Sequence, residues 1–291
     1  MNINTQTDYL RKKYSDTETV DILKNAGFDH MDFSFFELRD YDTNADKEDF
    51  KKRFTELRKY AEDKGIYFTQ AHAPFASSFK DEAQTALRFD EIVNAMRNAS
   101  YLGIKHIVVH PCQHLCYDHG NNAEKLFEIN MDFYKRLLPY AEEFGIVMCT
   151  ENMWQHYGDR KIWISTCALP EEFNAYIDSI NSPFLRGCLD IGHTVLVGQN
   201  PASFIRKMGA DRLCALHVHD VSGHEDSHTL PYYGIIHWDE VTQALKEIGY
   251  KGEITLEADN FMRNTPKELM PEAEKYMATV ARSLADASSN A

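Results

Sequence analysis

The sequence predicts an α/β protein with the architecture of a (β/α)₈ TIM barrel, and two regularities carry this prediction. Glycine, or once asparagine, recurs between a helical pattern and a short apolar run, at Gly27, Gly65, Gly103, Gly145, Asn181, Gly209 and Gly249. The gaps between these markers are 38, 38, 42, 36, 28 and 40 residues. Glycine, and less readily asparagine, supplies the left-handed residue just past a helix, so each marker predicts a helix end followed by a strand.

These seven helix-to-strand units follow a first strand expected in residues 1–7 and precede a closing helix over residues 266–284. The sum is eight strands alternating with eight helices, which is the count of a TIM barrel. Apolar residues at three- and four-residue steps support helices over 81–102 (Phe89, Val93, Met96) and 121–144 (Leu126, Phe133, Leu137, Ala141). No linker-like tract divides the chain, so residues 1–291 are expected to form a single domain.

Composition narrows the functional classes. The chain has 31 basic and 45 acidic residues, a net charge of −14, with 43% hydrophobic residues, which excludes intrinsic disorder. The acidic balance disfavours nucleic acid as a partner. No apolar run is long enough for a membrane helix, and the start MNINTQTDYLRKKYSD is polar. We therefore expect a cytoplasmic protein that has no membrane partner and whose cysteines are free. A homo-oligomer is compatible with these features.

Polar residues end six successive predicted strands. They are His72 in FTQAHAPF, His110 in IVVHP, Glu151 in VMCTENMW, Asp190 in CLDIGHT, His217 in ALHVHD and Glu257 in ITLEAD. Alternation along each strand directs these side chains into the mouth of the barrel. Gathered carboxylates and imidazoles would repel and desolvate one another unless a divalent cation joined them, and mixed Glu, Asp and His ligation suits Mn²⁺, Co²⁺, Zn²⁺ or Mg²⁺.

The motifs TENMW, CLDIGHT, LHVHD followed by DSHTLPYYGIIHW, and ITLEAD resemble, in that order and spacing, the sugar phosphate isomerase/epimerase superfamily of xylose-isomerase-like TIM barrels. The resemblance implies a divalent metal, Mn²⁺ before Zn²⁺, Co²⁺ or Mg²⁺, held by Glu151, Asp190, His217 and Glu257. His217 is preferred to His219 because the ligand of that superfamily stands three residues before an acidic residue, here Asp220. It also implies that Glu151 and Glu257 act as acid and base on the two faces of the substrate.

A second branch of the superfamily, the zinc-dependent apurinic-site endonucleases, resembles the chain at further positions. They are His72, His110, His193, Asp226 and His228, which are expected to hold a second metal or the substrate. Two features depart from the ketose epimerases: the arginine after the metal histidine is missing from HVHDVSGHED, and Tyr157 replaces a glutamate. Substrate contacts are expected instead from loop residues, namely Trp154, Arg160, Trp163, Tyr232 and Tyr233.

The function predicted from these residues is that of a metal-dependent sugar isomerase or epimerase acting on a keto- or aldo-sugar. The reaction removes a proton beside a carbonyl and passes through an enediolate, and the partner is a small-molecule sugar. Three alternatives stay open: a keto-sugar lyase or dehydratase that uses the same first step, an endonuclease-like multinuclear zinc phosphodiesterase, and a non-catalytic sugar-binding module.

Overall fold

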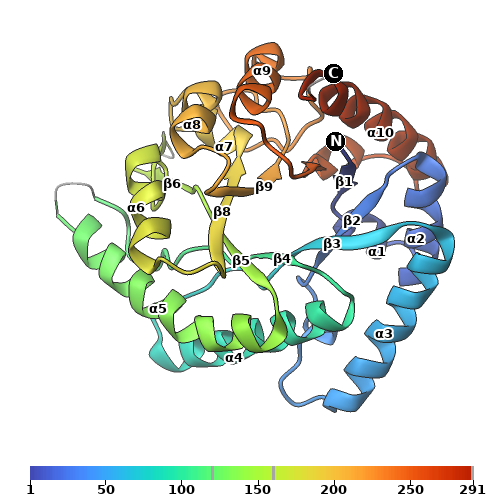
Figure 1. Ribbon diagram of the computed structural model, residues 1–291, viewed down its shortest axis with the longest axis horizontal. Helices are drawn as coiled ribbons and strands as arrows, with labels where there is room; N and C mark the ends of the chain where they lie inside the picture. The colour runs from blue at the N-terminus through green and yellow to red at the C-terminus, as the bar shows by residue number, and fades with distance from the viewer. Residues whose placement is uncertain (119–120, 159–160, 290–291) are drawn as a thin grey trace.

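Eight parallel strands form a closed ring in the computed structural model, which describes residues 1–118, 121–158 and 161–289 (Figure 1). Six of them pair in one sheet and two in another, while single bridges from Gln6 to Asp32 and from Val218 to Leu256 join the sheets. The predicted TIM barrel is therefore confirmed. In ring order the strands are β1 (Ile3–Thr5), β2 (His30–Ser34), β3 (Tyr67–His72), β4 (His106–Val108), β5 (Val147–Glu151), β8 (Leu185–Asp190), β9 (Leu213–His217) and β10 (Ile254–Leu256).

Eight helices surround this ring, one after each strand (Figure 1). Shorter segments occupy the loops that leave the carboxyl ends of the strands: α1 (Asp8–Arg11), η1 (Leu38–Asp40), the hairpin β6 (Trp154–Tyr157) and β7 (Lys161–Ile164), α7 (Ile191–Leu196), η2 (Asp259–Met262) and η3 (Lys267–Leu269). The outer helices are α2 (Asp16–Ala26), α3 (Lys47–Lys64), α4 (Glu82–Tyr101), α5 (Ala123–Phe144), α6 (Pro170–Ile180), α8 (Pro201–Met208), α9 (Trp238–Ile248) and α10 (Met270–Ala287).

The helix ends follow the markers seen in the sequence. Glycines at 27, 65, 145 and 249 and Asn181 adopt the left-handed conformation directly after a helix. Gly209 differs, because its φ of 70° is combined with an extended ψ of 167°. The closing helix begins at residue 270 rather than 266, since Pro271 is tolerated only in the first turn of a helix.

A small apolar layer fills the barrel directly below the polar strand ends. Val108, Cys149, Cys188 and Ala215 pack there as a separate buried cluster. Each stands two residues before a polar strand-end residue, so alternation turns both toward the barrel axis at successive depths. All six cysteines are free. The short side chains of this layer lie buried beneath the site.

The two ends of the chain meet where the ring closes. Strand β1 pairs in parallel with β10, and the amino group of Met1 lies 3.0 Å from the hydroxyl of Ser289. Near the other end of the same strands, Gln6 Nε2 donates to Glu257 Oε1 at 2.7 Å. Across the described ranges, no helix combines the length and the apolar character needed to span a bilayer.

The buried carboxyl of Glu274 on α10 gives a pH-dependent stability. Burial raises its pKa well above the usual value, Asp259 raises it further, and neither oxygen has a hydrogen-bond partner in the described structure. The folded state therefore keeps a proton that the unfolded chain releases above about pH 4, and stability falls as the pH rises from there toward the folded-state pKa.

We expect Glu274→Gln to remove this dependence. The free energy of unfolding, measured in urea, should be higher in the variant than in the parent by at least about 1 kcal/mol at about pH 8.5. This difference should be smaller at about pH 5. Glu272→Gln, an exposed change on the same helix, is the control and should alter neither value. Equal slopes of stability against pH in parent and Glu274→Gln would contradict the assignment.

Candidate metal centre and active site

Four residues from successive ring strands form the first centre. Glu151 ends β5, Asp190 ends β8, His217 ends β9 and Glu257 follows β10. Their nearest ligand atoms all lie within 4.8 Å of one another. Nδ1 of His217 is 3.1 Å from Glu151 Oε1, 3.1 Å from Glu257 Oε2 and 4.0 Å from Asp190 Oδ2. The structure thus brings together the four metal ligands expected from the sequence.

The electrostatics of this first centre favour a cation. Three carboxylates face one imidazole, and at least 88% of each side chain is hidden from solvent. Burial alone would raise the pKa of Glu151, but His217 and His110 lower it. Burial would also raise the pKa of Glu257, but three histidines lower it, namely His217, His228 and His72. Glu151 and Glu257 are therefore carboxylates at neutral pH. Glu257 Oε2 approaches His217 without hydrogen-bond geometry. One nitrogen and several oxygen donors fit Mn²⁺, Zn²⁺, Co²⁺ or Mg²⁺.

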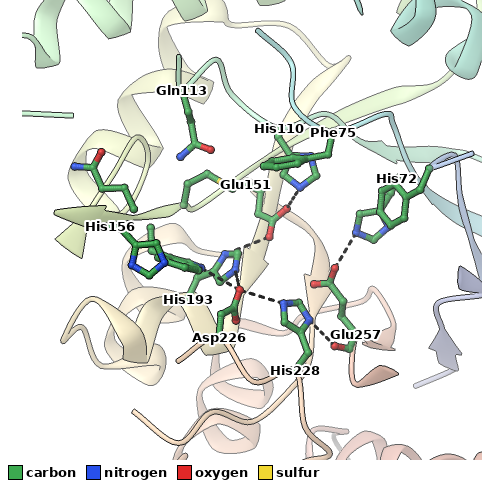
Figure 2. Close-up of a pocket in the computed structure, with 14 residues that line it drawn as sticks. His72, Phe75, His110, Gln113, Glu151, His156, His193, Asp226, His228 and Glu257 are labelled. Atoms are coloured by element: carbon green, nitrogen blue, oxygen red, sulfur yellow. Dashed lines mark hydrogen bonds and ion pairs between the residues drawn. The ribbon is translucent and has the colours of Figure 1, made fainter. Parts of the chain in front are cut away.

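Two histidines hold the outer oxygens of the glutamates, as Figure 2 shows. His110 Nε2 lies 2.9 Å from Glu151 Oε2, and His72 Nε2 lies 3.4 Å from Glu257 Oε1. Each glutamate therefore points one oxygen at His217 and the other at a second histidine. Asp32, which is fully buried on β2, lies 2.9 Å from Nδ1 of His72. Burial lowers the pKa of His72, but Asp32 and Glu257 together raise it to about 9.

A second cluster adjoins the first. Its members are His193, His219, Asp226 and His228, whose ligand atoms also lie within 4.8 Å of one another. Asp226 Oδ2 is 3.1 Å from both His193 Nε2 and His228 Nε2, and it accepts a hydrogen bond from the Trp154 indole at 3.0 Å (Figure 2). Burial alone would raise the pKa of Asp226, but His193 and His228 lower it strongly. Oδ1 of Asp226 is buried without a hydrogen bond.

His219 joins the two clusters and was not expected to be a ligand from the sequence. Its Nε2 is 3.0 Å from Asp190 Oδ2, and its ring stacks on His228 at 4.1 Å. A Cβ at position 192 would lie 2.1 Å from Cε1 of His219. The glycine in CLDIGHT therefore makes room for this ring.

The two centres open into one cavity of ≈ 620 Å³. Trp154 and the five further histidine and aspartate positions predicted from the sequence line it. Sequence reasoning missed Phe36, Phe75, Gln113, Met153, Gln155 and His156, which complete the wall.

Three of the expected substrate contacts lie elsewhere. Trp163, Tyr232 and Tyr233 are more than half exposed and stand outside the described lining of this cavity. Tyr232 packs against Trp238, and Tyr233 packs against Phe261 and Tyr276. Arg160 lies outside the described residues.

Residues 20–282 match the family described as "Xylose isomerase-like TIM barrel". An uncharacterized protein of Methanocaldococcus jannaschii is 31% identical over 194 residues, which are 65% of this chain and 64% of that protein. A D-psicose 3-epimerase of Enterocloster bolteae is 28% identical over 262 residues, 84% of this chain and 76% of that enzyme.

Solved structures share the fold over nearly the whole chain. A D-tagatose 3-epimerase-like protein superposes with a TM-score of 0.72 and 23% identity, covering 96% of this chain and 98% of that one. The IOLI protein with a bound zinc atom superposes with a TM-score of 0.75 and 16% identity, covering 99% of this chain and 98% of that one. The 3-keto-D-glucoside 4-epimerase of E. coli superposes with a TM-score of 0.71 and 16% identity, covering 97% of this chain and 99% of that one.

Proposed function

Because the chain belongs to the xylose isomerase-like TIM-barrel family, we propose that it is a metal-dependent sugar isomerase or epimerase. The observation that carries the proposal is the pair of buried glutamates, Glu151 and Glu257, set around one imidazole at the base of a cavity large enough to admit a sugar. A D-psicose 3-epimerase among the relatives supports the same class of reaction.

Glu151, Asp190, His217 and Glu257 would hold the divalent ion, with Mn²⁺ the favoured choice. Such an ion withdraws electron density from a substrate carbonyl and so stabilises the enediolate formed when the neighbouring proton leaves. A non-catalytic sugar-binding module is disfavoured, since binding alone needs no second carboxylate beside the first.

The glutamates would move the proton. Each has one oxygen toward the centre and the other beside a histidine, His110 for Glu151 and His72 for Glu257. One glutamate removes the proton beside the carbonyl. The imidazole next to that glutamate shares the change of charge on the glutamate carboxyl. The other glutamate returns a proton, or a hydroxyl leaves in the lyase variant of the same first step. Gln6 and Asp32 keep Glu257 and His72 in place.

The test combines metal content with hydrogen exchange. Purified protein should carry at least one divalent ion per chain, lose thermal stability on chelation, and incorporate solvent deuterium beside the carbonyl of a bound keto-sugar only when metal is present. Affinity without exchange identifies a binding module, and exchange with loss of a hydroxyl identifies a lyase. Metal-free protein whose melting does not respond to Mn²⁺, Co²⁺ or Zn²⁺ would refute the proposal.

A second candidate function is favoured by the second cluster. His193, His219, Asp226 and His228 would hold a further ion beside the first, and a multinuclear zinc site suits phosphodiester cleavage. The net charge of −14 argues against a DNA substrate, because the gain from counterion release needs surplus cations. We expect neither binding nor incision of duplex DNA with an abasic site at physiological salt. Chelator-sensitive incision would reverse the ranking of the two functions.

A further inference from the structure

The outer part of the cavity is aromatic. Phe36 follows β2 and Phe75 follows β3, and both line the cavity with 37% and 56% of their surface exposed. Their rings meet the histidines of the site edge-on: Phe75 lies 4.9 Å from the His110 ring, and Phe36 lies 5.6 Å from the His72 ring. Figure 2 shows Phe75 beside His110, and both phenyl groups contact histidines that lie next to the glutamates. Exposed phenyl surface of this extent beside a functional cavity marks a binding surface.

The cavity is also larger than one sugar. A hexose has twelve non-hydrogen atoms and fills at most about 360 Å³, even if each atom is given the ≈ 30 Å³ that a water molecule occupies in the liquid. Against a cavity of ≈ 620 Å³ that Phe36 and Phe75 help to line, a sugar placed at the carboxylates leaves more than a third of the space open.

The walls formed by residues that follow β4 and β5 suit an uncharged group. Met153 and Trp154 line the side that follows β5, with Gln113, Gln155 and His156 beside them. The amide of Gln155 is engaged by Tyr117 and by the carbonyl of Ile164, and Gln113 donates to Ser165. Aromatic, thioether and already bonded amide groups match an apolar ring better than a phosphate.

We propose that the substrate is a neutral glycoside whose second group is an apolar or aromatic ring, and that Phe75 and Phe36 bind that ring while the sugar occupies the glutamates. This inference rests on the proposed function, because it places the sugar at Glu151 and Glu257. Phe75 and Phe36 are specificity-determining residues in this assignment, since they contact the aglycone and not the reacting carbon.

The experiment compares two ligands of the Mn²⁺-loaded protein, methyl and phenyl 3-keto-β-D-glucoside, by titration calorimetry and by deuterium exchange beside the carbonyl. The phenyl compound should bind about 10-fold more tightly or better. Phe75→Ala and Phe36→Ala should each bring that ratio close to one, because the phenyl compound loses more affinity than the methyl compound does. Tyr157→Ala is the matched control, because this exposed tyrosine of the β6–β7 hairpin stands outside the described cavity lining and should keep the parent ratio.

Equal affinity for the two glycosides in the parent, or a ratio unchanged in both phenylalanine variants, would overturn the proposal even when exchange proceeds. Failure of the proposed function reads differently: the phenyl preference and its loss in Phe75→Ala persist, but neither glycoside exchanges hydrogen. Because Phe75 is more than half exposed, its truncation should leave the melting temperature unchanged, and Phe36→Ala provides an independent second variant.

Discussion

Glu151→Gln and Glu257→Gln should each lower turnover by about 10²-fold or more, the usual contribution of general acid and base catalysis. Glutamine keeps an oxygen donor and nearly the same shape but cannot take up a proton. The two carboxylates approach His217 from β5 and from the segment after β10, so they reach a substrate from different sides. If each serves one face, one of the variants should still exchange the hydrogen beside the carbonyl with deuterated solvent while failing to complete turnover.

The measurement is steady-state turnover together with deuterium incorporation, at saturating Mn²⁺ so that weakened metal binding does not dominate. Glu225→Gln, an exposed change next to Asp226, is the control and should keep parent activity. Full activity in both glutamate variants, or product formed in deuterated water without label beside the carbonyl, would exclude the enediolate route and indicate hydride transfer or hydrolysis.

Gly192→Ala should destabilise the protein by about 1–3 kcal/mol, the range typical of overpacking, and should abolish binding of the second ion proposed for the cluster that contains His219. The added methyl group would lie 2.1 Å from the His219 ring, which is fully buried and stacked on His228. The ring cannot yield without leaving Asp190 and the second cluster. Urea unfolding and metal analysis after dialysis measure the two effects.

The double variant Gly192→Ala/His219→Ala separates the clash from the loss of the ligand. Because the shorter side chain relieves the overlap, the double variant should unfold at a higher urea concentration than Gly192→Ala alone and still lack the second ion. Parent-like stability of Gly192→Ala would show that the close approach at residue 192 does not constrain His219.

The barrel and the grouping of the strand-end residues could be predicted because both depend on local rules. Glycine after a helix marks each unit, and alternation along a strand turns Cys149 and Glu151 toward the same axis. Asp32 could not be identified in the same way. A polar residue within a strand cannot be distinguished from a structural core residue until its partner, here His72, is known. Phe75 likewise reads as core although the structure leaves it half exposed.

The tyrosines after β9 illustrate a long-range effect that no local pattern contains. Asp220 accepts hydrogen bonds from the backbone of Tyr232 and Ile236 and from the indole of Trp238, at 2.9 to 3.1 Å. This one carboxylate folds the loop back on itself and holds Tyr232 against Trp238, on the outside of the barrel. Proximity to a strand end in the sequence therefore did not translate into proximity to the site.

Ring closure between β1 and β10 also sets an order of events during synthesis on the ribosome. Chains emerge from the amino terminus, so β1 waits for its second neighbour until residues 254–256 have been translated. Glu257 is supplied by that late segment, and its partner Gln6 by the earliest one. A nascent chain that has not yet reached residue 257 thus displays at most three of the four residues of the first centre. A chain truncated before β10 lacks both the strand that closes the ring and one carboxylate of this centre.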